Sequence, residues 1–98
     1  MTHTVRIRPD AEWDLEDAAR WYESQQQGLG QAFLNSVSES LHLIQENPLA
    51  FPRVHRDSRR ALIRKFPFGV HFVISEDAVV VIAVMHGSRD PRRWKIRT

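Results

Sequence analysis

The stretch from Ala78 to Met85 is an uninterrupted run of eight apolar residues near the C-terminal end of a 98-residue chain. A helix that spans a bilayer needs roughly 20 apolar residues, so this run is too short to cross a membrane. A continuous run of this length, rich in Val, is typical of a strand that is covered on both faces. We therefore expect residues 78–86 to form the central strand of a small sheet.

Other parts of the chain carry weaker strand patterns. Alternating or β-branched sequences predict three more strands, at residues 3–8, 60–65 and 69–75. Val5 and Ile7 should face inward in the first of them. The short Glu76–Asp77 connection predicts an antiparallel hairpin of the last two strands, whereas residues 49–58 are expected to form a surface loop.

Two helical patterns lie between the first two strands. The first begins at about Ala11, with Asp10 as its expected cap, and the second ends before Pro48, which cannot continue a helix. The apolar stripes are Ala11, Leu15, Ala18 and Tyr22 in the first helix and Phe33, Val37, Leu41 and Ile44 in the second. Because only a few residues separate the helices, residues 10–47 should form an antiparallel hairpin.

The order β-α-α-β-β-β predicts a two-layer α+β domain, in which the helical hairpin packs on one face of a small antiparallel sheet. One such domain accounts for residues 1–98. The chain has no cysteine, which excludes disulfides and thiolate zinc sites, and its five histidines lack the spacing of metal ligands. We expect no cofactor or metal, and the start of the chain has no signal-peptide core, so we expect an intracellular protein.

Charge is divided unevenly along the chain. Residues 1–50 hold three basic and eight acidic side chains, whereas residues 51–98 hold eleven basic and four acidic ones. A basic C-terminal half, with a basic tail at residues 87–98, predicts a polyanion or an acidic protein as partner. The alternative is ordinary surface charge that keeps the protein soluble.

The sequence after the expected central strand holds the strongest candidate site. His86 is suited to acid–base chemistry, Arg89, Arg92 and Arg93 to holding phosphate, and Trp94 to stacking. The alternative is structural, with His86 bonded to a backbone group and Trp94 packing the tail onto the sheet.

Four further side chains are worth noting. Two of them, Arg64 and Trp13, have both a functional and a structural interpretation, and the other two, Trp21 and His71, have a structural one. Arg64 either faces the same surface as the tail or is an exposed charge that discourages aggregation of an edge strand. Trp13 lies opposite the apolar stripe of its helix, where it either anchors a protein partner or packs on the loop at Phe51. Trp21 lies beside that stripe and is expected in the core, and His71 is expected to be structural.

The chain resembles the RelE/ParE superfamily of type II toxin–antitoxin toxins over almost its full length. The likeness is carried by Ala11, Asp14, Leu15 and Tyr22, by residues 30–34, by Ile44–Pro48, by Arg64–Phe72 and by Val79–Asp90. The resemblance implies a small cytoplasmic bacterial toxin that a cognate antitoxin neutralises with an extended segment. Trp13, Asp14, Asp17 and Trp21 would then contact the antitoxin.

The superfamily splits by target, and the sequence favours the ParE-like branch. Its apolar strand ends in His86 and is followed by Arg89 and Asp90, and Gly69 or Val70 stands where RelE-like nucleases commonly place an Arg. ParE-like members inhibit DNA gyrase by protein contact, which here would involve Arg64, His86, Arg89, Arg92, Arg93 and Trp94. No membrane contact and no direct DNA binding by the toxin alone are expected.

Two alternatives stay open. A RelE-like ribosome-dependent mRNA endoribonuclease would use His86 as general acid–base, with Arg64 and Arg89 neutralising phosphate. A degenerate toxin would retain antitoxin binding only.

Overall fold

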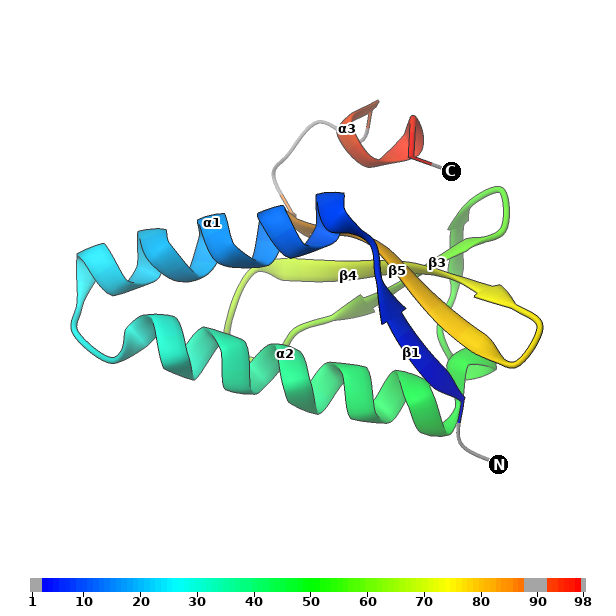
Figure 1. Cartoon of the computed structure of the whole chain (residues 1–98), viewed down its shortest axis with the longest axis horizontal. Coiled ribbons are helices and arrows are strands. Elements are labelled where there is room, and N and C mark those ends of the chain that lie inside the picture. Colours follow the sequence, from blue (N-terminus) through cyan, green and yellow to red (C-terminus); the bar gives the residue numbers. More distant parts are fainter. Residues whose placement is uncertain (1–2, 88–91, 98) are drawn as a thin grey trace.

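A computed structural model describes residues 3–87 and 92–97, which form two layers (Figure 1). One layer is a pair of antiparallel helices, α1 (Pro9–Gln25) and α2 (Leu29–Glu46). The described strands are β1 (Thr4–Ile7), β2 (Arg53–His55), β3 (Ser58–Leu62), β4 (Phe68–Ser75) and β5 (Ala78–His86). A 3₁₀ helix, η1 (Pro48–Ala50), follows α2, and a short helix, α3 (Arg92–Lys95), follows β5. The predicted α+β fold class is confirmed.

The described strands form one sheet in the order β1-β5-β4-β3-β2, with β5 near its middle, as its apolar sequence predicts. All neighbours are antiparallel except β1 and β5, which run parallel. The prediction of a purely antiparallel sheet is therefore wrong at β1. No turn joins β1 to β5, so the long intervening chain is free to bring β5 back in the same direction.

Two strand boundaries also differ from the prediction. β3 covers Ser58–Leu62 instead of residues 60–65, because the chain turns after Ile63 and Lys65 adopts a φ of 70°. Arg64 therefore lies in the turn before β4 and not in a strand. Within the expected loop at 49–58, Arg53–His55 forms β2, a strand too short to show a pattern in the sequence.

A proline starts the helical hairpin, and a glycine with a positive φ forms its turn. α1 starts at Pro9, two residues before the prediction, because a proline at the first helical position loses no intrahelical hydrogen bond. Asp10 is therefore inside the helix and is not its cap. At the turn, Gly28 takes a φ of 87°, and the Glu23 carboxylate accepts hydrogen bonds from the N–H groups of Gly28 and Gly30. A Cβ on Gly30 would lie 2.6 Å from the Ala19 carbonyl oxygen, so the helices approach very closely there.

Both predicted apolar stripes pack against the sheet. Tyr22 lies among Phe33, Phe66 and Phe68, with ring centroids 4.9–6.0 Å apart. Trp21 is 58% exposed, so the prediction that it belongs to the core is wrong. Its position next to the stripe places its ring at the edge of the helix–sheet interface instead of inside it.

The pairing of β4 with β5 shifts by one residue. His71 is opposite Ala83 and Phe72 is opposite Val81, which leaves Ile82 as the extra residue of a β-bulge. Side chains of β5 therefore alternate between the two faces on either side of the bulge, while Ile82 and Ala83 share one face. Val79, Val81 and Val84 pack toward the helices, while Ile82, Ala83 and Met85 pack on the opposite face with Val54, Val73 and Val80. Burial on both faces explains the unbroken apolar run.

Candidate functional site: a cleft between α1 and β5

β5 extends beyond the strand beside it. β1 pairs only with Ala78–Val81, and the last backbone contact on this side is the Arg8 N–H that donates to the Val81 carbonyl at 3.0 Å. Residues 82–86 of β5 have no strand on this side within the described chain, and α1 passes alongside them. The space between α1 and this half of β5 is a cleft of about 630 Å³.

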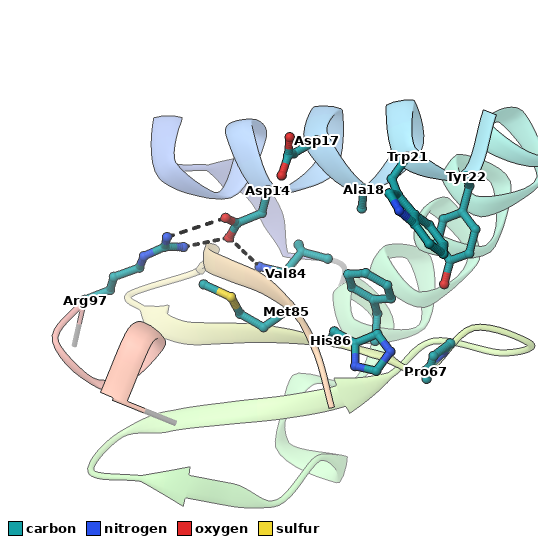
Figure 2. A pocket seen from close by; sticks show the side chains of 11 residues that line it. Asp14, Asp17, Ala18, Trp21, Tyr22, Pro67, Val84, Met85, His86 and Arg97 are labelled. Carbon is teal, nitrogen blue, oxygen red and sulfur yellow. Dashed lines mark hydrogen bonds and ion pairs between the residues drawn. The ribbon is translucent and has the colours of Figure 1, made fainter. Parts of the chain in front are cut away.

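The cleft is lined by two helical turns and two strand ends (Figure 2). Its lining residues are Asp14, Asp17, Ala18, Trp21 and Tyr22 of α1, Pro67 and Phe68 beside β4, Val84, Met85 and His86 of β5, and Arg97. Charged groups gather at one end and aromatic rings at the other.

Asp14 and Arg97 meet at the charged end. The Asp14 Oδ2 atom accepts a hydrogen bond from the Val84 N–H at 2.9 Å and another from Arg97 Nη1 at 2.6 Å. The same Arg97 nitrogen donates to the Ile82 carbonyl at 3.1 Å. Two side chains therefore bond two backbone groups of β5, the Ile82 carbonyl and the Val84 N–H, on the side where β1 has ended.

The aromatic end surrounds His86. Its ring packs edge-to-face on Phe68, with centroids 5.3 Å apart, and Phe68 in turn contacts Tyr22. Burial raises the pKa of the Tyr22 hydroxyl. His86 thus lies on the side of the sheet that carries the helices.

A second histidine lies on the opposite face. His71 is 3% exposed and pairs across the sheet with Arg60 and Ala83. Burial, then the positive charges of Arg60 and Arg97, lower the pKa of His71 to about 4. The imidazole is neutral at pH 7, as a structural histidine would be.

A comparison with models of protein families identifies the family. A family model described as "ParE toxin of type II toxin-antitoxin system, parDE" matches residues 5–91. The chain belongs to the ParE toxin family. A comparison with the sequences of curated proteins found no match to this ParE-family chain.

Solved structures show the same fold. A chain of the chromosomal ParDE toxin–antitoxin system of P. aeruginosa is similar with a TM-score of 0.77 and 12% identity, covering 87% of this chain and 96% of that one. A chain of the RelBE2 toxin–antitoxin complex of Mycobacterium tuberculosis has a TM-score of 0.65 and 20% identity, over 88% and 99% of the two chains. A mutant of the E. coli toxin RelE in the free state has a TM-score of 0.73 and 14% identity, over 99% and 97%.

The predicted target-contact and catalytic residues of this ParE-family toxin are spread over several places. His86 lies in the cleft, whereas Arg64 is exposed in the turn before β4 and does not line it. Arg92 is exposed at the start of α3. Arg89, and the side chains of Arg93 and Trp94, lie outside what the structure describes.

The predicted antitoxin contacts of this ParE-family toxin lie on two sides of α1. Trp13 and Trp21 are 67% and 58% exposed, and Asp17 is exposed at the cleft. Asp14 points inward instead, because Val84 and Arg97 engage its carboxylate.

Sequence reasoning missed Arg97 altogether. Its guanidinium lies beside an acidic group 83 positions earlier in the chain, and no local pattern links the two. The only available signal was general, since the tail is basic and the first helix is acidic. Arg97 also lies beyond residue 91, where the match to the ParE family model ends.

The described residues form neither a metal-binding cluster nor a helix that could span a membrane. No group of three or more His, Asp or Glu side chains there is arranged to hold a metal ion. None of the helices described is both long enough and apolar enough to cross a membrane.

Proposed function

We propose that this ParE-family toxin inhibits DNA gyrase by protein contact, without a reaction of its own, and that a cognate antitoxin neutralises it. The observation that carries the proposal is the position of His86, which lies in the cleft beside α1 and packs on Phe68. The match to the ParE family model supports the same branch.

RNA cleavage would make a different demand on the site. A general acid–base and cationic groups must surround one phosphate within hydrogen-bond reach. Arg64 does not line the cleft that holds His86, and the histidine of the helix-free face, His71, is buried and neutral at pH 7. Neither His86 nor His71 therefore combines, among the described residues, an open surface with a cluster of cations in the way that this chemistry needs.

Cations on the exterior suit a contact surface better than an active site. Arg92 and Lys95 are exposed on α3, and Arg64 is exposed in the turn before β4. Long-range attraction from such groups speeds the association with an acidic protein surface, and it weakens as salt is added. We assign the gyrase contact to the basic tail at residues 87–98, which includes Arg92, Arg93, Trp94 and Lys95.

The antitoxin contact is assigned to the outer side of α1. Trp13 exposes a large ring there, Trp21 exposes another at the rim of the cleft, and large exposed aromatic side chains are common anchors of protein interfaces. The P. aeruginosa ParDE and M. tuberculosis RelBE2 structures are those of toxin–antitoxin systems, which supports an antitoxin as the partner.

Two parallel assays on the purified chain test the target. Gyrase supercoiling and DNA cleavage are measured alongside cleavage of mRNA on ribosomes. We expect gyrase inhibition with DNA breaks and intact mRNA. Ribosome-dependent mRNA cuts without an effect on gyrase would overturn the proposal in favour of a nuclease. Inactivity in both assays, with antitoxin binding retained, would overturn it in favour of a degenerate toxin.

A charge-reversal pair locates the contact. R92E combined with K95E should weaken gyrase inhibition by about tenfold or more, because both charges lie on the assigned surface. R53E combined with R56E is the matched control, since Arg53 and Arg56 are exposed on β2 and in the turn after it, at the far edge of the sheet. An equal loss in the control would show that the effect is one of net charge and not of the α3 surface.

A further inference from the structure

The edge of β5 after the bulge presents backbone groups that need partners. The Ile82 carbonyl and the Val84 N–H both point to the side where β1 has already ended. Backbone groups left unpaired away from water cost about as much as a lost hydrogen bond, so folded chains rarely leave them so. Groups other than a neighbouring strand must therefore supply hydrogen-bond partners for this edge.

Two side chains from distant segments do so together. Arg97 donates to the Ile82 carbonyl, Asp14 accepts from the Val84 N–H, and the two are joined to each other at 2.6 Å. A second contact between the two side chains, Arg97 Nη2 to Asp14 Oδ1 at 3.5 Å, completes a forked arrangement of guanidinium and carboxylate.

This pair is unlike an ordinary surface salt bridge. The side chains of Arg97 and Asp14 are only 20% and 15% exposed, so water and salt screen the pair poorly. Further contacts converge on Arg97: its carbonyl accepts from Arg8 Nη1 at 3.2 Å, and its Nε lies 3.8 Å from Asp10. Removing either member of the pair would leave the other partly buried and without its main partner.

The helix that precedes Arg97 needs such an anchor. α3 is only four residues long, about one turn, and an isolated helix of that length is not stable in water. Its place on the protein must come from tertiary contacts. Arg97 lies two residues after the end of α3, and it is fixed to both α1 and β5.

We propose that Asp14 and Arg97 form a clasp that holds residues 92–97 against the bulged edge of β5, and that Asp14 is the positioning residue for the cations of α3. The second half of this statement rests on the proposed contact between α3 and gyrase. The clasp itself depends only on the geometry of the free chain.

Amide hydrogen exchange on the full chain tests the clasp directly. In R97A, the amides of residues 95–97 should exchange about tenfold faster or more, while those of α2 and β3 keep their rates. D14N should show a smaller change, because its amide oxygen still accepts from Val84 and from Arg97 without the charge. D17N is the control, since Asp17 is an exposed aspartate on the same helix, one turn later. Unchanged tail exchange in both R97A and D14N, or an unprotected tail in the wild type, would overturn the clasp.

Gyrase inhibition by the same variants tests the positioning role. R97A should lose inhibition by about tenfold and D14N by less, and R97K, which keeps the charge, should recover part of the loss seen in R97A. Antitoxin affinity measured in parallel should stay unchanged in R97A. A freed tail with full inhibition would overturn the positioning role and leave the clasp standing. A wild-type chain without effect on gyrase would end the proposed function and the positioning role together, while hydrogen exchange would still decide the clasp.

Discussion

The two halves of β5 differ in the groups that bond their backbone on the side away from β4. Residues 78–81 bond to a strand on each side, β1 and β4. After the bulge residue Ile82, residues 83–86 pair with β4 on one side, but on the other side of residues 82–86 the described partners of the backbone are the side chains of Asp14 and Arg97.

The two kinds of partner differ in how easily a substitution removes the hydrogen bonds of the β5 backbone. A strand neighbour supplies backbone groups whatever its sequence, so single substitutions leave its hydrogen bonds in place. A side-chain neighbour depends on one particular residue, and one substitution removes it. We infer that one substitution in α1 or at Arg97 can remove a backbone partner of the second half of β5, whereas the backbone partners of the first half do not depend on any one side chain.

Deletion of Ile82 is the most severe way to break the comparison. The deletion removes a side chain that is 1% exposed from the cluster on the face opposite the helices, together with the bulge, while Ala83 and Val84 keep their places opposite His71 and Val70. We expect a loss of about 4 kcal/mol or more in the free energy of unfolding, measured by urea denaturation with circular dichroism. I82A, which keeps the residue count and the bulge, is the control and should lose less. A deletion variant as stable as I82A would show that the bulge contributes nothing beyond the Ile82 side chain.

The next largest effect is a pH dependence that comes from His71, which pairs with Ala83 just after the bulge. Its pKa is lowered to about 4 by burial and by the charges of Arg60 and Arg97. Between pH 6.5 and pH 4 the unfolded imidazole is protonated and the folded one is not. Unfolding therefore takes up a proton in this range, and stability falls as the pH falls through it.

The expected contribution is up to about 3 kcal/mol, lost between pH 6.5 and about pH 4. Urea denaturation of the wild type and H71Q across this range measures it, because the difference between the two removes the carboxylates that titrate in both. Parallel curves for the two proteins would contradict the assignment.

Substitution of Asp14 should have a smaller effect on stability. D14A leaves the Val84 N–H and Arg97 without their acceptor and should cost about 1–3 kcal/mol in thermal or urea unfolding. D14N keeps an acceptor and should cost less. D17A, on the exposed side of the same cleft, should stay within about 0.5 kcal/mol of the wild type. Equal costs for D14A and D17A would mean that side chains do not complete this half of the strand.

The smallest effect on stability is expected for Trp13, which lies on the outer side of α1. W13A should unfold within about 0.5 kcal/mol of the wild type, because the ring is 67% exposed. Its affinity for the antitoxin should nevertheless fall by about tenfold or more, measured by calorimetry. L43A is the control, a 54% exposed Leu on α2 outside the assigned surface. Loss of affinity in L43A alone would move the antitoxin contact to α2.

Local patterns predicted much of this fold. The continuous apolar run predicted that β5 lies inside the sheet, and the apolar stripes predicted α1 and α2. Burial on one face leaves a periodic pattern in the sequence, and burial on both faces leaves a continuous apolar run. Trp21 shows the limit of that method: its position next to the stripe suggested burial, yet its ring is at the surface.

Features made by distant residues were not predictable in this way. The parallel pairing of β1 with β5 joins segments more than 70 positions apart. The bulge at Ile82 was hidden because both faces of β5 are apolar, so no change of alternation marks it. The charged end of the cleft depends on Arg97, whose partner in α1 only the folded chain identifies.

The place of β5 in the sheet has a consequence for synthesis on the ribosome. The strand that contacts both β1 and β4 is the last of the five described strands to be made, so the first strand waits for a neighbour until nearly the whole chain has emerged. The helical hairpin, whose contacts are local, is free to form much earlier, with its apolar side uncovered. A premature stop codon before Ala78 would therefore yield a fragment that lacks β5 and in which β1 has lost the strand that it pairs with.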